Sequence, residues 1–349
     1  MLGIELTPEH PVSRVGELGA LAEGAGFGAA FVSHHYNNRD EFITLAEIAA
    51  RTDTIALGPG VVNPYETHPV TLASRMATLD EFADGRGILG LGAGDRTTLA
   101  NLGIDRARPL RRVLETIRVT RRLMNGERVD HDGTFEAVDA GLNYDAGPVP
   151  TYVGAQGPDM LRMGAKHADG VLFNGSHPRD VEWAAERVAE GRTARGKGGD
   201  PTDGDDRGEQ SGDAEDGEAA NDAEEAAFVV YASVSVARDG DAAREAARPP
   251  VAFIAAGAPD QVLERHGIDR DVATAIADSV AAGEFTVAFE AVTPAMLDAF
   301  CVAGTPETVG ERLGRIAAVA DGVVVGSPLG PDSETAIDLA GTLARDLPV

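Results

Sequence analysis

Cysteine is almost absent from this sequence, since Cys301 is the only one in 349 residues. A single thiol cannot form an internal disulfide, a CxxC redox pair or a cysteine-ligated zinc site, and such scarcity is typical of a reducing compartment. The chain also lacks an uninterrupted apolar run of about 18 residues and a signal-peptide pattern at its start. We therefore expect a cytoplasmic protein that does not enter a membrane.

Lysine is the second scarce residue type. Only Lys166 and Lys197 occur, so arginine makes up nearly all of the 30 basic residues, against 57 acidic residues and a net charge of −27. This charge repels nucleic-acid backbones and anionic membranes, so neither is expected as a partner. An acidic, lysine-poor composition is typical of proteins that work in concentrated salt. A GC-rich genome would explain the arginine but not the acidic excess, so we expect a halophilic source.

Aromatic residues make up only 5% of the chain, but 43% of the residues are apolar, which is enough for a core of Ala, Val, Ile and Leu. Short apolar runs alternate with helical stretches, as in βαβ units with a parallel sheet. Eight such strands favour a closed (β/α)8 barrel over an open sheet, and we expect residues 1–349 to form one barrel domain. Strands are predicted to start near residues 2, 29, 54, 87, 149, 170, 229 and 322. Helices are predicted over 12–23, 41–51, 68–82, 108–124, 158–166, 179–190, around 242–247 and over 307–320, with a helical or irregular stretch at 253–300.

Two segments interrupt this alternation. Residues 127–144, which contain His131–Gly133, are predicted to form an inserted hairpin. Residues 197–226 hold twelve Asp or Glu residues and almost no large apolar side chain. Such a segment buries too little apolar surface to offset its ordering entropy, so we expect a disordered acidic loop.

The active site of a (β/α)8 barrel lies where its strands end. Glu5 lies within the first apolar strand, and a carboxyl at the barrel mouth loses hydration, which raises its pKa toward the range of a general acid. Pairing with an arginine, or an outward orientation, is the alternative. The histidine pair His34–His35 is not accompanied by a further His or a cluster of Asp and Glu at ligand spacing, so no metal is expected. The other strand ends contribute His34–Asn38, Gly58–Tyr65, Gly92–Asp95, Gly154–Pro158, Asn174–His177 and Gly326–Pro331.

Glycine-rich turns follow several strands, where bare backbone can approach a phosphate or a ring closely. Gly90–Gly94 lacks the full GxGxxG spacing of a Rossmann fold. Gly154–Gly157 precedes Pro158 at a helix start, where free N–H groups can hold an anion. The residues alone therefore indicate a barrel enzyme with a glycine-lined site for a flat, phosphate-bearing ligand, without specifying a reaction.

Several segments in the same order resemble the coenzyme F420-dependent methylenetetrahydromethanopterin reductases of the bacterial-luciferase-like superfamily. The resemblance extends over nearly the whole chain apart from the hairpin and the acidic loop. The matching segments are Gly3–Leu6, His35–Asn38, Leu57–Val61, Asn63–Tyr65, Ala77–Glu81, Val153–Pro158, Val251–Gly257, Glu264–Gly267 and Gly326–Pro331.

This resemblance implies a luciferase-like barrel, F420 as a deazaflavin hydride carrier and a homodimer or homotetramer. It places the essential glutamate at Glu5 and a non-prolyl cis peptide, which backs the deazaflavin ring, at Gly60–Val61. The implied reaction moves a hydride from reduced F420 to the methylene carbon of a reduced pterin, with Glu5 protonating the departing pterin nitrogen. The coenzyme phosphate is expected near residues 154–157 or 174–177. The implied coenzyme-binding residues are His35, Gly60, Val61, Asn63, Gly92, Asp95, Gly154, Ala155, Gln156, Gly157, Asn174 and Ser176.

Three points stay open at this stage. Relatives usually have Asp where this chain has His34, which alters the charge beside His35. The pterin could be tetrahydromethanopterin or tetrahydrofolate, with flux in either direction. Two other functions compete: a flavin (FMN)-dependent monooxygenase of the same superfamily, and a non-catalytic barrel that only binds F420 or a pterin.

Overall fold

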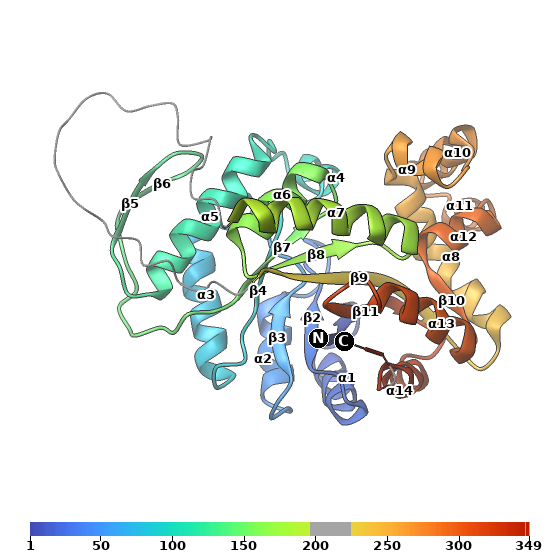
Figure 1. Cartoon of the computed structure of the whole chain (residues 1–349), viewed down its shortest axis with the longest axis horizontal. Coiled ribbons are helices and arrows are strands. Elements are labelled where there is room, and N and C mark those ends of the chain that lie inside the picture. Colours follow the sequence, from blue (N-terminus) through green and yellow to red (C-terminus); the bar gives the residue numbers. More distant parts are fainter. Residues whose placement is uncertain (196–224, 346, 349) are drawn as a thin grey trace.

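The computed structural model describes residues 1–195, 225–345 and 347–348. Eight parallel strands form its centre, paired in the order β3-β2-β1-β11-β9-β8-β7-β4. Bridges between Leu57 and Gly87 and between Val62 and Leu91 join the two ends of this order, so the sheet closes. The predicted (β/α)8 barrel is therefore confirmed (Figure 1). The barrel strands are β1 (Leu2–Leu6), β2 (Ala29–Val32), β3 (Ala56–Pro59), β4 (Leu89–Leu91), β7 (Thr151–Ala155), β8 (Gly170–Asn174), β9 (Ala227–Val236) and β11 (Gly322–Leu329).

Helices surround these strands, and several begin at a side chain that caps the first turn. Asp40 accepts a hydrogen bond from Ile43 N at the start of α2, and Asp95 accepts one from Thr98 N at the start of α4. These caps fix the helix starts that follow the loops after β2 and β4. The surrounding helices are α1 (Val12–Ala25), α2 (Glu41–Ala49), α3 (Pro69–Phe82), α4 (Arg96–Asn101), α5 (Pro109–Met124), α6 (Pro158–His167), α7 (Pro178–Arg195), α13 (Pro306–Ala317) and α14 (Ser333–Ala344).

Strand alternation separates the two faces of the barrel. Ile4 and Leu6 are fully buried in the large core between the strands and the helices. Phe31, Leu172 and Val324 belong to a second cluster, which fills the barrel interior. Because side chains alternate along a strand, Glu5 between Ile4 and Leu6 points into that interior. The packing thus directs the carboxyl to the barrel mouth.

In sequence, the five helices α8–α12 separate β9 from the short strand β10 (Val302–Gly304). The strand β10 pairs with β9, and the helices form a layer beside them. This layer has its own buried core, which includes Val251, Ile276 and Met296. The helix predicted around 242–247 is present and is longer than that range, because α8 continues through Pro249 and Pro250 to Gly257. Each proline removes one helical hydrogen bond, but burial of neighbours such as Val251 outweighs the loss. The layer comprises α8 (Gly240–Gly257), α9 (Asp260–Arg265), α10 (Arg270–Ala281), α11 (Phe285–Glu290) and α12 (Pro294–Phe300).

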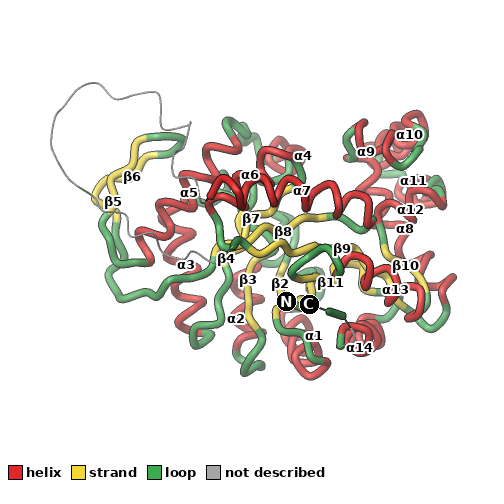
Figure 2. Tube along the Cα trace, viewed as in Figure 1, coloured by secondary structure: helices red, strands yellow, loops and turns green. Residues whose placement is uncertain are grey.

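The segment 127–144 contains two antiparallel strands, β5 (Val129–Asp132) and β6 (Glu136–Ala140), drawn apart from the barrel strands in Figure 2. Arg112 on α5 joins this hairpin to the loop after β3. Its guanidinium donates to the carbonyls of Pro64 and Thr134 and lies 4.7 Å from the centre of the Tyr65 ring. The hairpin is thereby fixed to a loop at the barrel mouth.

The prediction for 197–226 lies outside the described residues, except for Glu225 and Ala226. Within the described part of the chain, no helix has the length and apolar character needed to cross a membrane.

Candidate active site

Glu5 lies at the carboxyl end of β1, where its Oε2 accepts a hydrogen bond from Ser327 N at 2.8 Å. Its side chain keeps some contact with solvent, yet its carboxyl is closely surrounded. Loss of hydration raises the pKa of Glu5, although the Ser327 amide and the hydroxyls of Tyr231 and Ser33 act in the opposite direction. A carboxyl in such surroundings can hold a proton and pass it to a bound base.

Two buried hydroxyls beside Glu5 lack a well-aligned hydrogen bond to any described residue: Ser33 Oγ and Tyr231 Oη. Both approach Glu5 closely enough to lower its pKa. Buried polar atoms are rarely left without a partner, so these hydroxyls indicate a place where a polar ligand completes the site. Ser33, Tyr231 and Ser327 were not among the predicted catalytic or coenzyme-binding residues. Ser33 lies just beyond β2, Ser327 lies near the end of β11 within the segment Gly326–Pro331, and Tyr231 lies in the middle of β9.

The Gly60–Val61 peptide after β3 is cis, at the position that the resemblance indicated. A Cβ added to Gly60 would lie 3.2 Å from Tyr231 Oη, which brings this turn beside the Glu5 cluster. The Val61 side chain packs against two backbone surfaces without side chains, since an added Cβ would lie 2.6 Å from Val61 Cγ2 at Gly92 and 3.0 Å from it at Gly154. Both glycines therefore provide room for Val61.

Asn63 is 4% exposed and organises the rest of this loop. Its Oδ1 accepts hydrogen bonds from Tyr65 N and Glu66 N, and its Nδ2 donates to Glu66 Oε1 at 2.7 Å. The other oxygen of Glu66, Oε2, lies 3.2 Å from Nε2 of His34. Nδ1 of His34 lies 2.9 Å from Glu41 Oε2 on α2. This network could not be predicted, because it joins the loop after β3 to His34 and Glu41 on other segments.

His35 lies beside this network, and its side chain reaches solvent while part of its ring is covered by the protein. Burial and the neighbouring His34 charge lower the pKa of His35, so this ring is the more readily neutral of the two. Asp95, predicted to contact the coenzyme, caps α4 through Thr98 N at 2.8 Å. One carboxylate oxygen is therefore engaged in holding the helix start.

The remaining predicted site residues lie at the ends of β7 and β8. Gly154 and Ala155 belong to β7, and Gln156 and Gly157 are exposed where α6 starts. Asn174 is exposed at the end of β8. Ser176 is buried, and its Oγ accepts a hydrogen bond from Ser233 N at 3.0 Å, which ties the loop after β8 to β9. These residues lie at the same end of the barrel as Glu5, and none of them hydrogen-bonds to it.

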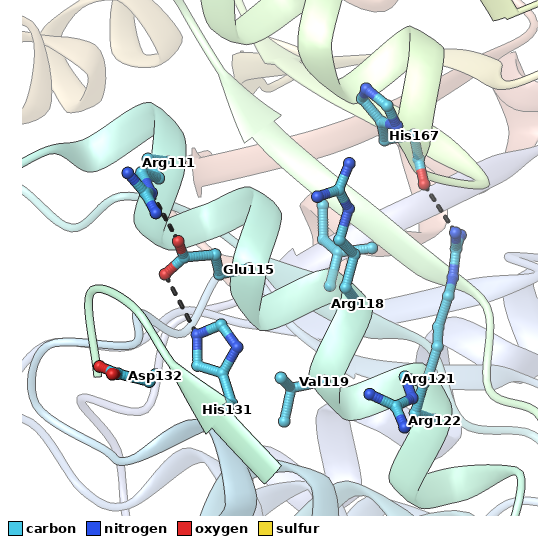
Figure 3. Close-up of a pocket in the computed structure, with 10 residues that line it drawn as sticks. Arg111, Glu115, Arg118, Val119, Arg121, Arg122, His131, Asp132 and His167 are labelled. Atoms are coloured by element: carbon cyan, nitrogen blue, oxygen red, sulfur yellow. Dashed lines mark hydrogen bonds and ion pairs between the residues drawn. The ribbon is translucent and has the colours of Figure 1, made fainter. Parts of the chain in front are cut away.

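A cavity of about 530 Å³ lies elsewhere, on the outer face of α5 (Figure 3). Arginines of α5 line it together with Glu115, His131 and His167, and Glu115 pairs with both Arg111 and His131. None of the predicted site residues lines this cavity. It belongs to the junction between α5, α6 and the hairpin, and not to the barrel mouth.

Comparison with known proteins places these features in a family. Residues 2–323 match the model described as luciferase-like monooxygenase. The chain is 39% identical over 345 residues to the 5,10-methylenetetrahydromethanopterin reductase of Archaeoglobus fulgidus, with 97% of each chain covered. A solved structure of the coenzyme F420-dependent tetrahydromethanopterin reductase from Methanopyrus kandleri superposes with a TM-score of 0.84 at 35% identity, and the match covers 97% of this chain and 96% of that one. An F420-dependent secondary alcohol dehydrogenase in complex with an F420-acetone adduct, at 17% identity and a TM-score of 0.73, shares the fold.

Proposed function

Because the chain belongs to the luciferase-like family and, within it, to the 5,10-methylenetetrahydromethanopterin reductases, we propose that it reduces a methylene-tetrahydropterin with F420 as hydride carrier. The observation that carries the proposal is Glu5, a carboxyl with a raised pKa at the mouth of the barrel. In the overall reaction the methylene carbon gains a hydride, its bond to one pterin nitrogen breaks, and that nitrogen gains a proton. Reduced F420 becomes oxidised.

The residues at the mouth fit a flat, polar coenzyme. The hydroxyls of Ser33 and Tyr231 lack a well-aligned hydrogen bond and could turn toward a polar ligand, and the turn at Gly60 lies directly beside Tyr231 Oη. In this proposal the residues that hold the coenzyme are His35, Gly60, Val61, Asn63, Gly92, Asp95, Gly154, Ala155, Gln156, Gly157, Asn174 and Ser176. Bound F420 in its reduced form supplies the hydride.

The chain's own contribution to the reaction is a proton and an orientation. Glu5 holds its proton up to a higher pH than an ordinary carboxyl and would donate it to the pterin nitrogen that leaves the methylene carbon. Ser327 N fixes the orientation of the carboxyl. General acid assistance of this kind accelerates a reaction by about 10²–10⁴-fold. Orientation of the two reacting carbons would supply the rest.

The proposal also covers the identity of the pterin, the oligomeric state, the cellular compartment and the salt concentration in which the protein works. Either tetrahydromethanopterin or tetrahydrofolate could carry the methylene group. The resemblance favours a homodimer or homotetramer, and the cysteine content favours the cytoplasm. The net charge of −27 with only two lysines favours a halophilic source.

The first test is anaerobic oxidation of reduced F420 in molar salt, with methylene-tetrahydromethanopterin and methylene-tetrahydrofolate offered separately. Turnover with one of them identifies the pterin. No turnover with either, while F420 still binds, would refute the proposed substrate class. Turnover of FMN with oxygen would favour the monooxygenase instead, and full activity of Glu5→Gln would remove Glu5 from the mechanism.

A further inference from the structure

Both ring nitrogens of His34 face carboxylates. Nδ1 lies 2.9 Å from Glu41 Oε2, and Nε2 lies 3.2 Å from Glu66 Oε2. An ionised carboxylate only accepts hydrogen bonds, so both nitrogens must carry hydrogen, and among the forms of histidine only the imidazolium does. His34 therefore places a positive charge between the start of α2 and the loop that follows β3.

This charge is connected to the coenzyme side of the mouth through one carboxylate. While Oε2 of Glu66 faces His34, Oε1 accepts a hydrogen bond from Asn63 Nδ2 at 2.7 Å. Asn63 is buried, and its Oδ1 accepts hydrogen bonds from the Tyr65 and Glu66 amides, so its side chain has one orientation. The Gly60–Val61 turn lies two residues before it.

We infer that His34 is a positioning residue for the coenzyme: its imidazolium holds Glu66, and through Glu66 it holds Asn63 and the turn at Gly60–Val61. The inference rests on the proposed placement of F420 against this turn. His34 itself need not touch the coenzyme or the pterin. Its contribution is to order the loop before the coenzyme arrives, which reduces the entropy lost on binding.

The bridge depends on the charge of His34 and so on pH. Burial alone would lower the pKa of His34, but hydrogen bonds and charges from Glu41 and Glu66 raise it overall. The bridge is therefore present below this raised pKa and is lost as the pH rises through it. The titratable neighbour of His34 besides these two carboxylates is His35. The negative charges of Asp95, Glu9 and Glu66 act on His35 in turn.

The experiment measures the Kd of F420 by fluorescence titration between pH 6 and 9.5, in the absence of pterin, for the wild type and three variants. His34→Gln removes the charge, and Glu66→Gln removes one of its two partners. His131→Gln is the matched control, since His131 also pairs with a carboxylate, Glu115, but lies on the hairpin. Circular dichroism and Tm establish that each variant is folded.

We expect His34→Gln to raise the Kd about tenfold at neutral pH, the size expected for loss of hydrogen bonds to a charged group, and His131→Gln to leave it within about twofold. In the wild type the Kd should rise on the alkaline side. That rise should be absent in His34→Gln and should move to lower pH in Glu66→Gln. An unchanged Kd in His34→Gln, or an alkaline rise that persists in it, would overturn the inference.

Should His34→Gln fail to fold, Glu66→Gln decides alone, and an unchanged Kd and pH profile in that variant would overturn the inference. Because no pterin is present, the result is independent of the proposed reaction. Normal F420 binding without turnover would refute the substrate while leaving His34 in its role.

Discussion

Replacing Glu5 by glutamine tests the proposed acid directly. Glutamine has the same shape, and its carbonyl oxygen can still accept the hydrogen bond from Ser327 N, which spans 2.8 Å in the wild type. What the change removes is the ionisable proton. We therefore expect F420 to bind with nearly the wild-type Kd, while kcat falls by about 10²–10⁴-fold, the usual contribution of a general acid.

The same substitution has a second effect, on stability, and its sign follows from the raised pKa. The native state keeps the Glu5 proton at pH values where the unfolded chain, with an ordinary pKa of about 4.3, has lost it. The wild type therefore loses stability as the pH rises from that value through the raised pKa, by up to about 1.4 kcal/mol for each unit of the shift. Glu5→Gln lacks this loss. The free energy of unfolding of Glu5→Gln should therefore increase relative to that of the wild type as the pH rises across the same interval.

The assay combines single-turnover rates with urea unfolding from pH 4.5 to 9. Glu17→Gln on the exposed face of α1 serves as the control, because surface substitutions change stability by less than about 0.5 kcal/mol. The wild-type rate should fall with rising pH as Glu5 ionises, and the residual rate of Glu5→Gln should be independent of that ionisation. Two results would refute the reasoning: a kcat within tenfold of the wild type, or parallel stability profiles for the two proteins.

Three further predictions concern stability. Gly92→Ala would bring a Cβ to 2.6 Å from Val61 Cγ2, so urea unfolding should show that the free energy of unfolding falls by about 1–3 kcal/mol. Adding Val61→Ala to the same chain should restore much of this free energy. Full stability of Gly92→Ala alone would contradict the packing. Glu115 has a pKa lowered to about 2 by Thr134, Arg111 and His131, so it contributes above its unfolded pKa and loses this contribution as the pH falls toward 2. Glu115→Gln should therefore cost about 1–3 kcal/mol at pH 7 and about half as much at pH 3, and an equal cost at both would contradict the assignment. Raising KCl from about 0.1 to about 3 M should raise Tm, because the salt screens the repulsion among 57 acidic residues that only 30 basic residues offset. A Tm that falls or stays constant would argue against adaptation to salt.

The barrel could be predicted because its signals are local. Each of the eight strands is a short apolar run, and all eight predicted starts lie within two residues of the observed ones, as for β1 at Leu2 and β8 at Gly170. Glu5 could be identified as a candidate because it interrupts an apolar strand. The direction of its side chain follows from the burial of Ile4 and Leu6 on either side.

Features that depend on contacts between distant segments could not be predicted. His34 was recognised only as an unusual residue beside His35, because its partners Glu41 and Glu66 lie 7 and 32 residues away on other elements. Helix α8 extends beyond the range predicted around 242–247, because local propensity disfavours Pro249 and Pro250 and takes no account of the core that α8 enters. The packing role of Gly92, whose missing side chain makes room for Val61, could not be predicted either, since it depends on a contact with another loop.

Arg112 and His34 have a joint consequence for attempts to redesign this enzyme. Arg112 fastens the hairpin to the loop at Pro64, and His34 fastens the start of α2 to the same loop through Glu66. A redesign should therefore keep both residues, because replacing either would disturb this loop together with the hairpin or α2. The layer α8–α12, with its separate core, follows β9, which lies nearly opposite β2 and β3 in the strand order. Substitutions in that layer should leave the hairpin, the loop and α2 undisturbed.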